Sequence, residues 1–117
     1  MQFVDGYVCA VPNQNKEIYR KLAQDAALIF KEHGASQVVE CWGEDVPDGK
    51  ITSFSMAVKK EPSETVVFAW VVWPSKEVRD LGNKKVMEDP RMNIDLDPRP
   101  FDGKRMIYGG FQMIVNE

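Results

Sequence analysis

Histidine and cysteine are scarce in this chain: His33 is the only histidine, and Cys9 and Cys41 are the only cysteines. A zinc site built from several imidazoles is therefore excluded, as is a helix with two metal-binding histidines. A haem enzyme is disfavoured because no ligand pattern accompanies the single histidine. The cysteines lack CxxC spacing, so we expect two buried thiols and no disulfide in a reducing compartment. The sequence predicts no metal and no cofactor.

Long apolar runs and an excess of basic residues are also missing. The longest apolar run, residues 66–73, is far too short to cross a bilayer, and the N-terminal segment lacks the basic leader of a signal peptide. Fifteen basic residues are spread among eighteen acidic ones, for a formal net charge of -3. Neither nucleic acid nor an anionic membrane would be attracted by such a balance. We therefore expect a cytoplasmic protein with no nucleic-acid partner and no membrane partner.

The composition is that of an ordinary folded domain. Apolar residues make up 44% of the chain and charged residues 28%, close to the averages of soluble globular proteins. A length of 117 residues fits one compact core. We expect a single domain over residues 1–117.

Hydrophobic periodicity predicts four strands and two long helices. The predicted strands span residues 3–11, 36–42, 65–73 and 104–115. The first helix runs from an N-cap at Asn13 to a C-terminal cap at Gly34, and the second follows Ser75 and ends before Pro90. Residues 51–59 are predicted to form a short strand or an extended connection, and residues 92–96 a short helical turn.

Each helix has one apolar face. The inward positions of the first helix are Ile18, Leu22, Ala26, Ile29, Phe30 and His33. Those of the second helix are Val78, Leu81, Lys85 and Val86. Each helix is therefore expected to pack through one side only.

The element order strand, helix, strand, strand, helix, strand is the split βαβ arrangement. Right-handed crossovers then place the first and third strands in the centre of a four-stranded antiparallel sheet, with both helices on one face. The predicted fold is α+β, a ferredoxin-like βαββαβ domain. Because residues 65–73 are apolar on both sides, the other sheet face needs a cover, and we expect a homodimer through the sheet face.

The stretch FDGKRMIYGGF, residues 101–111, places two glycines within a run of aromatic and aliphatic residues. A phosphate-binding glycine loop follows a strand and leads into a helix, whereas strand residues stand on both sides of Gly109 and Gly110. A strand glycine marks a bulge or the close approach of a side chain, a backbone or a ligand. We expect Trp70, Trp73 or a side chain of the first helix to fill that space, with a ligand as the alternative.

Asp5 stands in an otherwise apolar strand. A carboxylate in that position must be paired, solvated or shifted in its pKa. The last strand offers Arg105, Lys104 or Tyr108 as partners. Structural pairing is the simpler interpretation and catalysis the alternative, and Glu40 in the second strand presents the same choice.

His33, at the end of the first helix, either completes the core-facing stripe or interacts with the helix dipole. The alternative is a general acid or base, because imidazole titrates near neutral pH. Lys104 and Arg105 follow a turn, where they either bind an anion or pair with a local carboxylate such as Asp102.

Two sets of candidate site residues result. The candidate catalytic residues are His33, Asp5 and Tyr108. The candidate ligand-binding residues are Arg105, Lys104 and Trp70.

Resemblance to a known family is carried by six segments: VDGYV (4–8), VECWGEDVPDGK (39–50), TSF (52–54), SKEVRD (75–80), DPRM (89–92) and PFDGKRMIYGGF (100–111). They run almost end to end, and the last is specific. Together they resemble the YbaA-like bacterial family of unknown function. The resemblance implies a ferredoxin-like domain of the dimeric α/β-barrel superfamily, in which two sheets pack face to face, and it implies no established activity.

That superfamily includes cofactor-independent antibiotic-biosynthesis monooxygenases, haem-binding enzymes and stress-response dimers, so the fold selects no activity. Our leading hypothesis is a cytoplasmic homodimer with a small apolar pocket between helix and sheet that holds a small metabolite. The alternative is a cofactor-independent monooxygenase-like or isomerase-like enzyme acting on a small aromatic or carbonyl compound. Three tryptophans, three tyrosines and the polar residues named above motivate that alternative.

Overall fold

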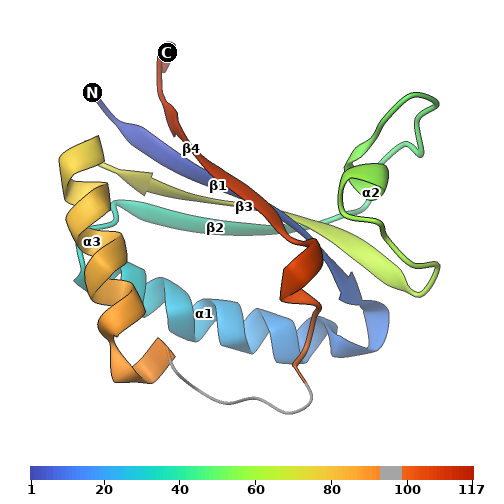
Figure 1. Ribbon diagram of the computed structural model, residues 1–117. Coiled ribbons are helices and arrows are strands. Elements are labelled where there is room, and N and C mark those ends of the chain that lie inside the picture. Colours follow the sequence, from blue (N-terminus) through green and yellow to red (C-terminus); the bar gives the residue numbers. More distant parts are fainter. Residues whose placement is uncertain (93–98) are drawn as a thin grey trace.

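Four strands and three α-helices make up the fold in the computed structural model, which describes residues 1–92 and 99–117 (Figure 1). In chain order they are β1 (Phe3–Pro12), α1 (Lys16–Glu32), β2 (Gln37–Trp42), α2 (Phe54–Ala57), β3 (Glu64–Trp73), α3 (Lys76–Glu88) and β4 (Ile107–Gln112). Short 3-10 turns span Asn13–Asn15, Pro90–Met92 and Gly103–Arg105.

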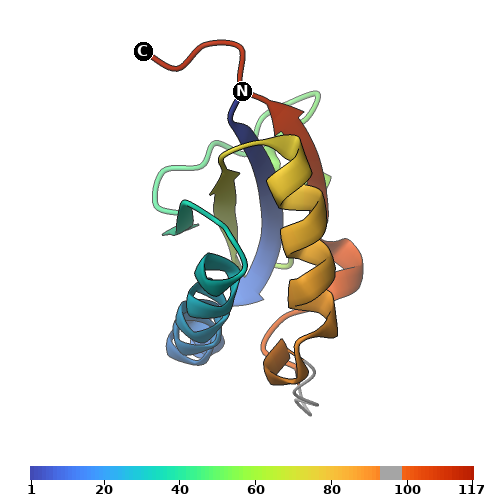
Figure 2. The same cartoon turned by 90° about the vertical axis from the view of Figure 1, so that its left-hand side faces the viewer.

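The strands form one antiparallel sheet in the order β2-β3-β1-β4. β1 and β3 pair along their whole length, from Phe3 opposite Trp73 to Pro12 opposite Glu64. Figure 2 shows α1 and α3 side by side on the same face of this sheet. The predicted α+β, ferredoxin-like βαββαβ fold is therefore confirmed, with the first and third strands in the centre.

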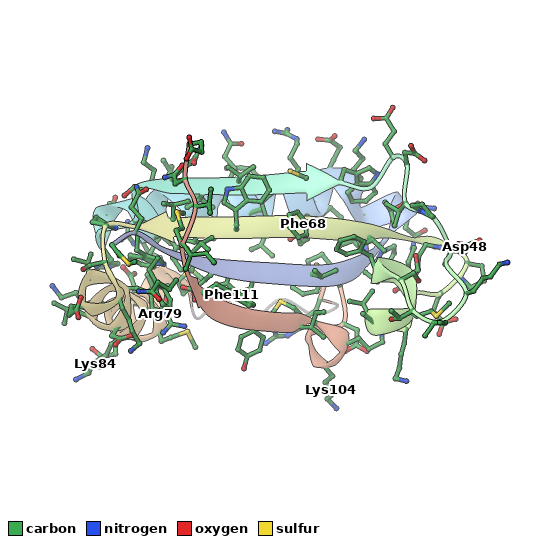
Figure 3. All side chains as sticks on the ribbon, turned by 90° about the horizontal axis from the view of Figure 1, so that it is seen from above. Asp48, Phe68, Arg79, Lys84, Lys104 and Phe111 are labelled. Carbon is green, nitrogen blue, oxygen red and sulfur yellow. The ribbon has the colours of Figure 1, made fainter. Side chains whose placement is uncertain are left out.

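Alternation along the strands divides the sheet into two faces. The face toward α1 and α3 takes Val67, Ala69, Val71 and Trp73 from β3, and these four side chains are buried. We call the opposite side the open face; its residues are Val4, Gly6, Val8, Ala10 and Pro12 of β1, Gln37, Val39 and Cys41 of β2, Glu64, Val66, Phe68, Trp70 and Val72 of β3, and Ile107, Gly109 and Phe111 of β4. Figure 3 looks onto this face, with Phe68 and Phe111 labelled.

One end of the open face is covered by α2, which lies on the side of the sheet opposite α1 (Figure 1). The sequence pattern favours a strand or an extended connection over residues 51–59, and that prediction is wrong. The hydroxyl of Ser53 accepts the Met56 backbone N–H at 3.0 Å, which caps a short helix. Val58 is then fully buried against β1 and β3. Capping and this burial decide the local structure, and neither depends on periodicity.

The ends of two other elements also differ from expectation. α1 begins at Lys16, because residues 13–15 form a 3-10 turn and Asn13 instead accepts a hydrogen bond from the hydroxyl of Thr65. β4 begins at Ile107, because Asp102 caps a 3-10 turn before it. Gly34 follows α1 with a φ of 111°, as expected of a helix cap. Of the helical turn predicted over residues 92–96, residues 93–96 lie outside the described part of the chain.

The inward faces of the helices are rotated slightly from the prediction. Ile18 is 59% exposed and Leu81 is 55% exposed, so neither belongs to the core. Tyr19 and Gly82 take the inward positions instead. The helical period predicts a stripe, but its exact centre depends on where the helix begins.

Gly82 lies where α3 packs against the end of α1 and the ring of Trp73. A Cβ at this position would lie 2.3 Å from Cζ3 of Trp73 and 2.6 Å from the backbone oxygen of His33. Trp73 is fully buried, so its ring has little space into which it can shift. We expect Gly82→Ala to lower the free energy of unfolding by about 1–3 kcal/mol through overpacking, although alanine favours helices. Denaturant unfolding followed by tryptophan fluorescence measures the change.

Gly103→Ala is the matched control for this substitution. No atom lies within 4 Å of the position that its Cβ would occupy. We expect the same unfolding midpoint as in the unmodified protein. A Gly82→Ala variant as stable as the Gly103→Ala control would contradict the packing argument.

Candidate functional site

A cavity of about 320 Å³ lies between α1 and the helix-facing side of the sheet. Most of its wall is apolar, with Leu22, Ala26 and Phe30 from α1 and Val38, Val67 and Ala69 from the sheet. Four polar or weakly polar side chains that reach it are Tyr7, Cys9, Tyr19 and Glu40, and Asp25, Arg91 and Arg99 line it as well. A concave, mainly apolar space with a few polar groups is the usual form of a small-molecule site.

The register of the sheet explains why space remains there. Glu40, Ala69, Tyr7 and Tyr108 form one row across all four strands. Ala69 fills little volume between its two larger neighbours. The rings of Tyr7 and Tyr108 are stacked with their centroids 6.3 Å apart. The row therefore places a carboxylate and a phenol on either side of a gap above Ala69.

Tyr19 and Glu40 form the shortest polar contact of the cavity. The Tyr19 hydroxyl, on α1, donates to Oε1 of Glu40, on β2, at 2.6 Å. Part of Glu40 is exposed at the edge strand, yet its carboxyl group lies in the cavity wall, where desolvation raises its pKa and the bond from Tyr19 opposes that rise. Burial first and the nearby carboxylate second raise the pKa of Tyr19 far above its usual value. Tyr19 is thus a neutral donor.

Cys9 and Tyr7, the other two of these four side chains, are neutral as well. Burial is the main cause that raises the pKa of the Cys9 thiol to about 11. Burial, followed by the charge of Asp5, raises the pKa of Tyr7 to about 12. Sγ of Cys9 lies 3.8 Å from the Tyr19 oxygen, a weak contact. Among these four side chains, Glu40 carries the only carboxyl group and is therefore the one suited to accept a proton.

Arg91 and Arg99 line one end of the cavity. The Arg91 guanidinium is held by Glu32 at 2.6 Å and by Asp89 at 2.7 Å. Asp89 also contacts Nε2 of His33 at 3.0 Å, and Arg91, followed by His33, holds the pKa of Asp89 well below its usual range. The structure thus places His33 in an ion-pair cluster that joins the end of α1 to the turn after α3.

Asp5 lies in a separate cluster beneath α3, where it is only 3% exposed. Its carboxylate accepts hydrogen bonds from Nη2 of Arg79 at 2.8 Å, from Nε1 of Trp73 at 3.0 Å and from Nδ2 of Asn83 at 3.4 Å. These contacts tie β1 to α3 and to the end of β3. Figure 3 shows Arg79 beside the sheet at the α3 end.

The partners expected for this carboxylate, Arg105, Lys104 and Tyr108, lie elsewhere, and that prediction is wrong. Arg105 pairs with Glu64 at 2.7 Å and with Asp102 at 3.1 Å, so the local pair that the sequence offered as an alternative is present. The Arg105 guanidinium holds the pKa of Glu64 below its usual value. Lys104 points away from the sheet (Figure 3).

Gly110, the second glycine of the pair in β4, makes room for side chains of β1 and α3. A Cβ at Gly110 would lie 2.7 Å from the Phe3 ring and 2.7 Å from Nη2 of Arg79. The Arg79 guanidinium also lies 5.0 Å from the centre of the Phe3 ring. The expected close approach of a side chain is therefore present, but Trp70 and Trp73 are not the residues that approach.

The remaining candidates, Trp70 and Tyr108, lie apart from one another, although Trp70 also borders the cavity. Trp70 projects on the open face, where its ring centroid is 5.6 Å from that of Phe68. Tyr108 is 73% exposed on β4 and stacks on Tyr7. The six candidate residues from the sequence do not converge on one site.

Sequence reasoning missed Tyr19 and gave Glu40 only brief attention. A signal for Tyr19 was present, because it precedes Leu22 by three residues and Ala26 by seven, and these positions share one helical face. Glu40 had no such signal, since a lone carboxylate on an edge strand is usually solvated. Its contact with Tyr19 depends on how α1 crosses β2.

Two searches of the described residues gave negative findings. Within residues 1–92 and 99–117, no three side chains of histidine, cysteine, aspartate or glutamate lie together as a metal site requires. Over the same residues, none of the helices combines the length and the apolar character needed to cross a bilayer.

Comparisons with known proteins place the chain in a family. The model of a family described as "Protein of unknown function (DUF1428)" matches residues 2–103. The uncharacterized protein YbaA of Escherichia coli is 59% identical over 117 residues, which is 100% of each chain. The uncharacterized protein YbaA of Shigella flexneri has the same identity and coverage.

Among solved structures, the crystal structure of SnoaB, a cofactor-independent oxygenase from Streptomyces nogalater, matches with a TM-score of 0.54 and 11% identity. The match covers 98% of this chain and 95% of that one. At such low identity the likeness concerns the fold alone. The family match and the two relatives confirm the resemblance read from the sequence: the chain belongs to the DUF1428 family of unknown function, together with the YbaA proteins.

Proposed function

We propose that this protein binds a small, largely apolar molecule in the cavity between α1 and the sheet. The cavity of about 320 Å³ carries this proposal, because its apolar wall surrounds one hydrogen-bonding pair, Tyr19 and Glu40. Apolar surface buried there contributes about 25 cal/mol per Å² to binding, and the polar pair orients the molecule. A small aromatic or alicyclic compound with one or two oxygen atoms fits both features.

Filling the gap above Ala69 tests the proposal. Native mass spectrometry of gently purified protein, beside the denatured mass, reports any retained molecule. Ala69→Leu adds three carbon atoms between Glu40 and Tyr7, so we expect the retained mass to disappear. Small aromatic compounds added back are then expected to bind the unmodified protein, and to bind the variant at least about tenfold more weakly.

Ala57→Leu is the control, because it adds the same atoms to an exposed position of α2. It should retain the molecule as the unmodified protein does. Equal retention by the Ala69→Leu variant would place the bound molecule outside this cavity and refute the proposal.

We also propose that two copies pair through the open face to form a homodimer. Of the open-face side chains named above only Glu64 is charged, and it is buried and paired with Arg105 at 2.7 Å, although charged residues make up 28% of the chain. Phe68, Ile107 and Phe111 are 43%, 44% and 60% exposed there. An uncharged apolar patch of this kind favours a partner surface, and a second copy offers the same patch through a two-fold axis.

The rim of the open face supports the same pairing. α2 rises at one end of the sheet, and residues after β4 rise at the other, where Asn116 donates to the side-chain oxygen of Gln2 at 2.6 Å. Between them runs a groove with Val4, Trp70 and Phe111 in its floor. A hollow with an uncharged floor can be filled by the protruding aromatic side chains of an identical sheet.

A further inference from the structure

From the geometry of the cavity we infer a proton-transfer site. Glu40 is the base that removes a proton from a carbon next to a carbonyl group of the bound molecule, and Tyr19 donates a hydrogen bond to that carbonyl oxygen. This inference rests on the proposed function, because it assigns chemistry to the same cavity. From the sequence, Tyr19 was not considered, and Glu40 was named only as a carboxylate that is either paired or catalytic.

Glu40 is the base because of its place in the sheet. It faces the cavity from β2, beside the gap above Ala69, so a bound molecule in that gap would lie next to its carboxylate. Tyr7, Tyr19 and Cys9 are phenols or a thiol that hold their protons, and the second carboxylate of the lining, Asp25, pairs with Lys21 at 2.7 Å. Desolvation raises the pKa of Glu40, which makes it a stronger base than an exposed glutamate.

Tyr19 is placed to stabilise the oxygen. Its hydroxyl donates to Oε1 of Glu40 at 2.6 Å, which fixes the carboxylate. The Tyr19 ring is held edge-on by Phe101, with the ring centroids 5.4 Å apart. A carbonyl oxygen beside Tyr19 would accept the same hydrogen atom, and Glu40 would then be free to take a proton. A fixed neutral donor of this kind stabilises negative charge that develops on an oxygen.

The step balances without a further reactant. The electron pair of the broken C–H bond forms a C=C bond, and the C=O π pair moves to the oxygen, which Tyr19 stabilises. The proton on Glu40 is then returned to that oxygen or, where the molecule carries a β,γ double bond, to its γ carbon. The reaction is a tautomerisation or a double-bond shift, with no net oxidation. The substrate class is therefore a small, mainly apolar ketone, keto acid or 1,3-dicarbonyl compound.

Deuterium exchange tests the inference with three chosen probes: phenylpyruvate, 2-tetralone and 2,4-pentanedione. Each is incubated with the full chain in D₂O, and loss of the α C–H signal is followed by proton NMR. We expect the protein to accelerate exchange of the two aromatic probes above the buffer rate. Glu40→Gln should reduce this acceleration by about 10²–10⁴-fold. Tyr19→Phe should reduce it by about 10²–10³-fold.

Glu44→Gln is the matched control, because it makes the same chemical change at an exposed loop position and should leave the acceleration unchanged. Glu40→Asp keeps a carboxylate but places it one carbon atom farther from the bound molecule. This variant should therefore retain part of the acceleration if Glu40 is the base. Circular dichroism of every variant checks the fold. Because glutamine closely matches glutamate in shape, we expect the Glu40→Gln variant to fold.

Binding of the probes is followed in parallel by saturation-transfer NMR. Binding without accelerated exchange would overturn the proton-transfer inference and leave the binding proposal intact. Acceleration that survives Glu40→Gln would also overturn it. No acceleration of any of the three probes overturns it whether or not they bind, and the Ala69→Leu retention experiment decides the binding proposal separately.

Discussion

Replacing Asp5 with alanine is expected to lower the free energy of unfolding by about 3–5 kcal/mol, because it removes one partner of a buried ion pair. Asp5 is 3% exposed, and the Arg79 side chain that it holds is 24% exposed. The substitution leaves this guanidinium partly buried without its anion. The N–H of Trp73, a fully buried residue, also loses its acceptor.

Denaturant unfolding of Asp5→Ala measures the loss, with Asp25→Ala as the control. Asp25 pairs with Lys21 at 2.7 Å on α1, but both side chains are more than half exposed, so its removal should leave the midpoint almost unchanged. Combining Asp5→Ala with Arg79→Met should cost less than the sum of the single changes, since no unpaired charge remains. A loss below about 1 kcal/mol for Asp5→Ala would show that the cluster contributes little.

The fold was predictable because its signals are local. Residues 65–73 place apolar side chains on both sides of the strand, so both faces of the sheet were expected to be covered. In the structure Ala69 and Trp73 lie under the helices, and Phe68 lies on the open face. The strand order followed from connection rules that depend only on element sequence. α2 was not predicted because a helix of four residues is too short to show the helical repeat of apolar positions.

The partners of the polar residues were not predictable in the same way. Arg79 stands 74 positions from Asp5, and within the sequence it looks like an ordinary surface charge of α3. Its contact with Asp5 requires the crossing of α3 over the sheet, where Gly110 leaves room for the guanidinium. The positions of Asp5 and Arg79 in the sequence give no information about how α3 crosses the sheet.

The cavity depends on register in the same way. Glu40 and Tyr7 are separated by one strand, and the small residue between them, Ala69, is identified only when the pairing of all three strands is known. A shift of one residue in the pairing of β2 would turn Glu40 to the open face. The chemistry proposed for Glu40 is thus a property of the sheet register, and the same register leaves the open face without charge apart from the buried Glu64.

Charge on the open face should separate the proposed homodimer. Introducing Phe68→Glu together with Phe111→Glu is expected to convert dimers into monomers. Aggregates are expected if the two subunits still associate through the apolar side chains that remain on the open face. Each substitution occurs twice in a two-fold dimer, so four carboxylates would be desolvated at one interface. Burying unpaired charge costs several kcal/mol, and every 1.4 kcal/mol weakens association about tenfold. Native mass spectrometry over a concentration series measures the shift.

Leu28→Glu provides the control, because Leu28 is 61% exposed on α1, close to the 60% of Phe111, and lies away from the open face. The control should remain dimeric. Phe68 and Phe111 are already exposed to solvent in the single chain, so their substitution should leave each subunit folded, and circular dichroism checks this. A double variant that stays a dimer as tight as the Leu28→Glu control would refute pairing through this face. A monomeric unmodified protein at high concentration would refute the homodimer itself, since the apolar side chains of the open face would then be stable in contact with water.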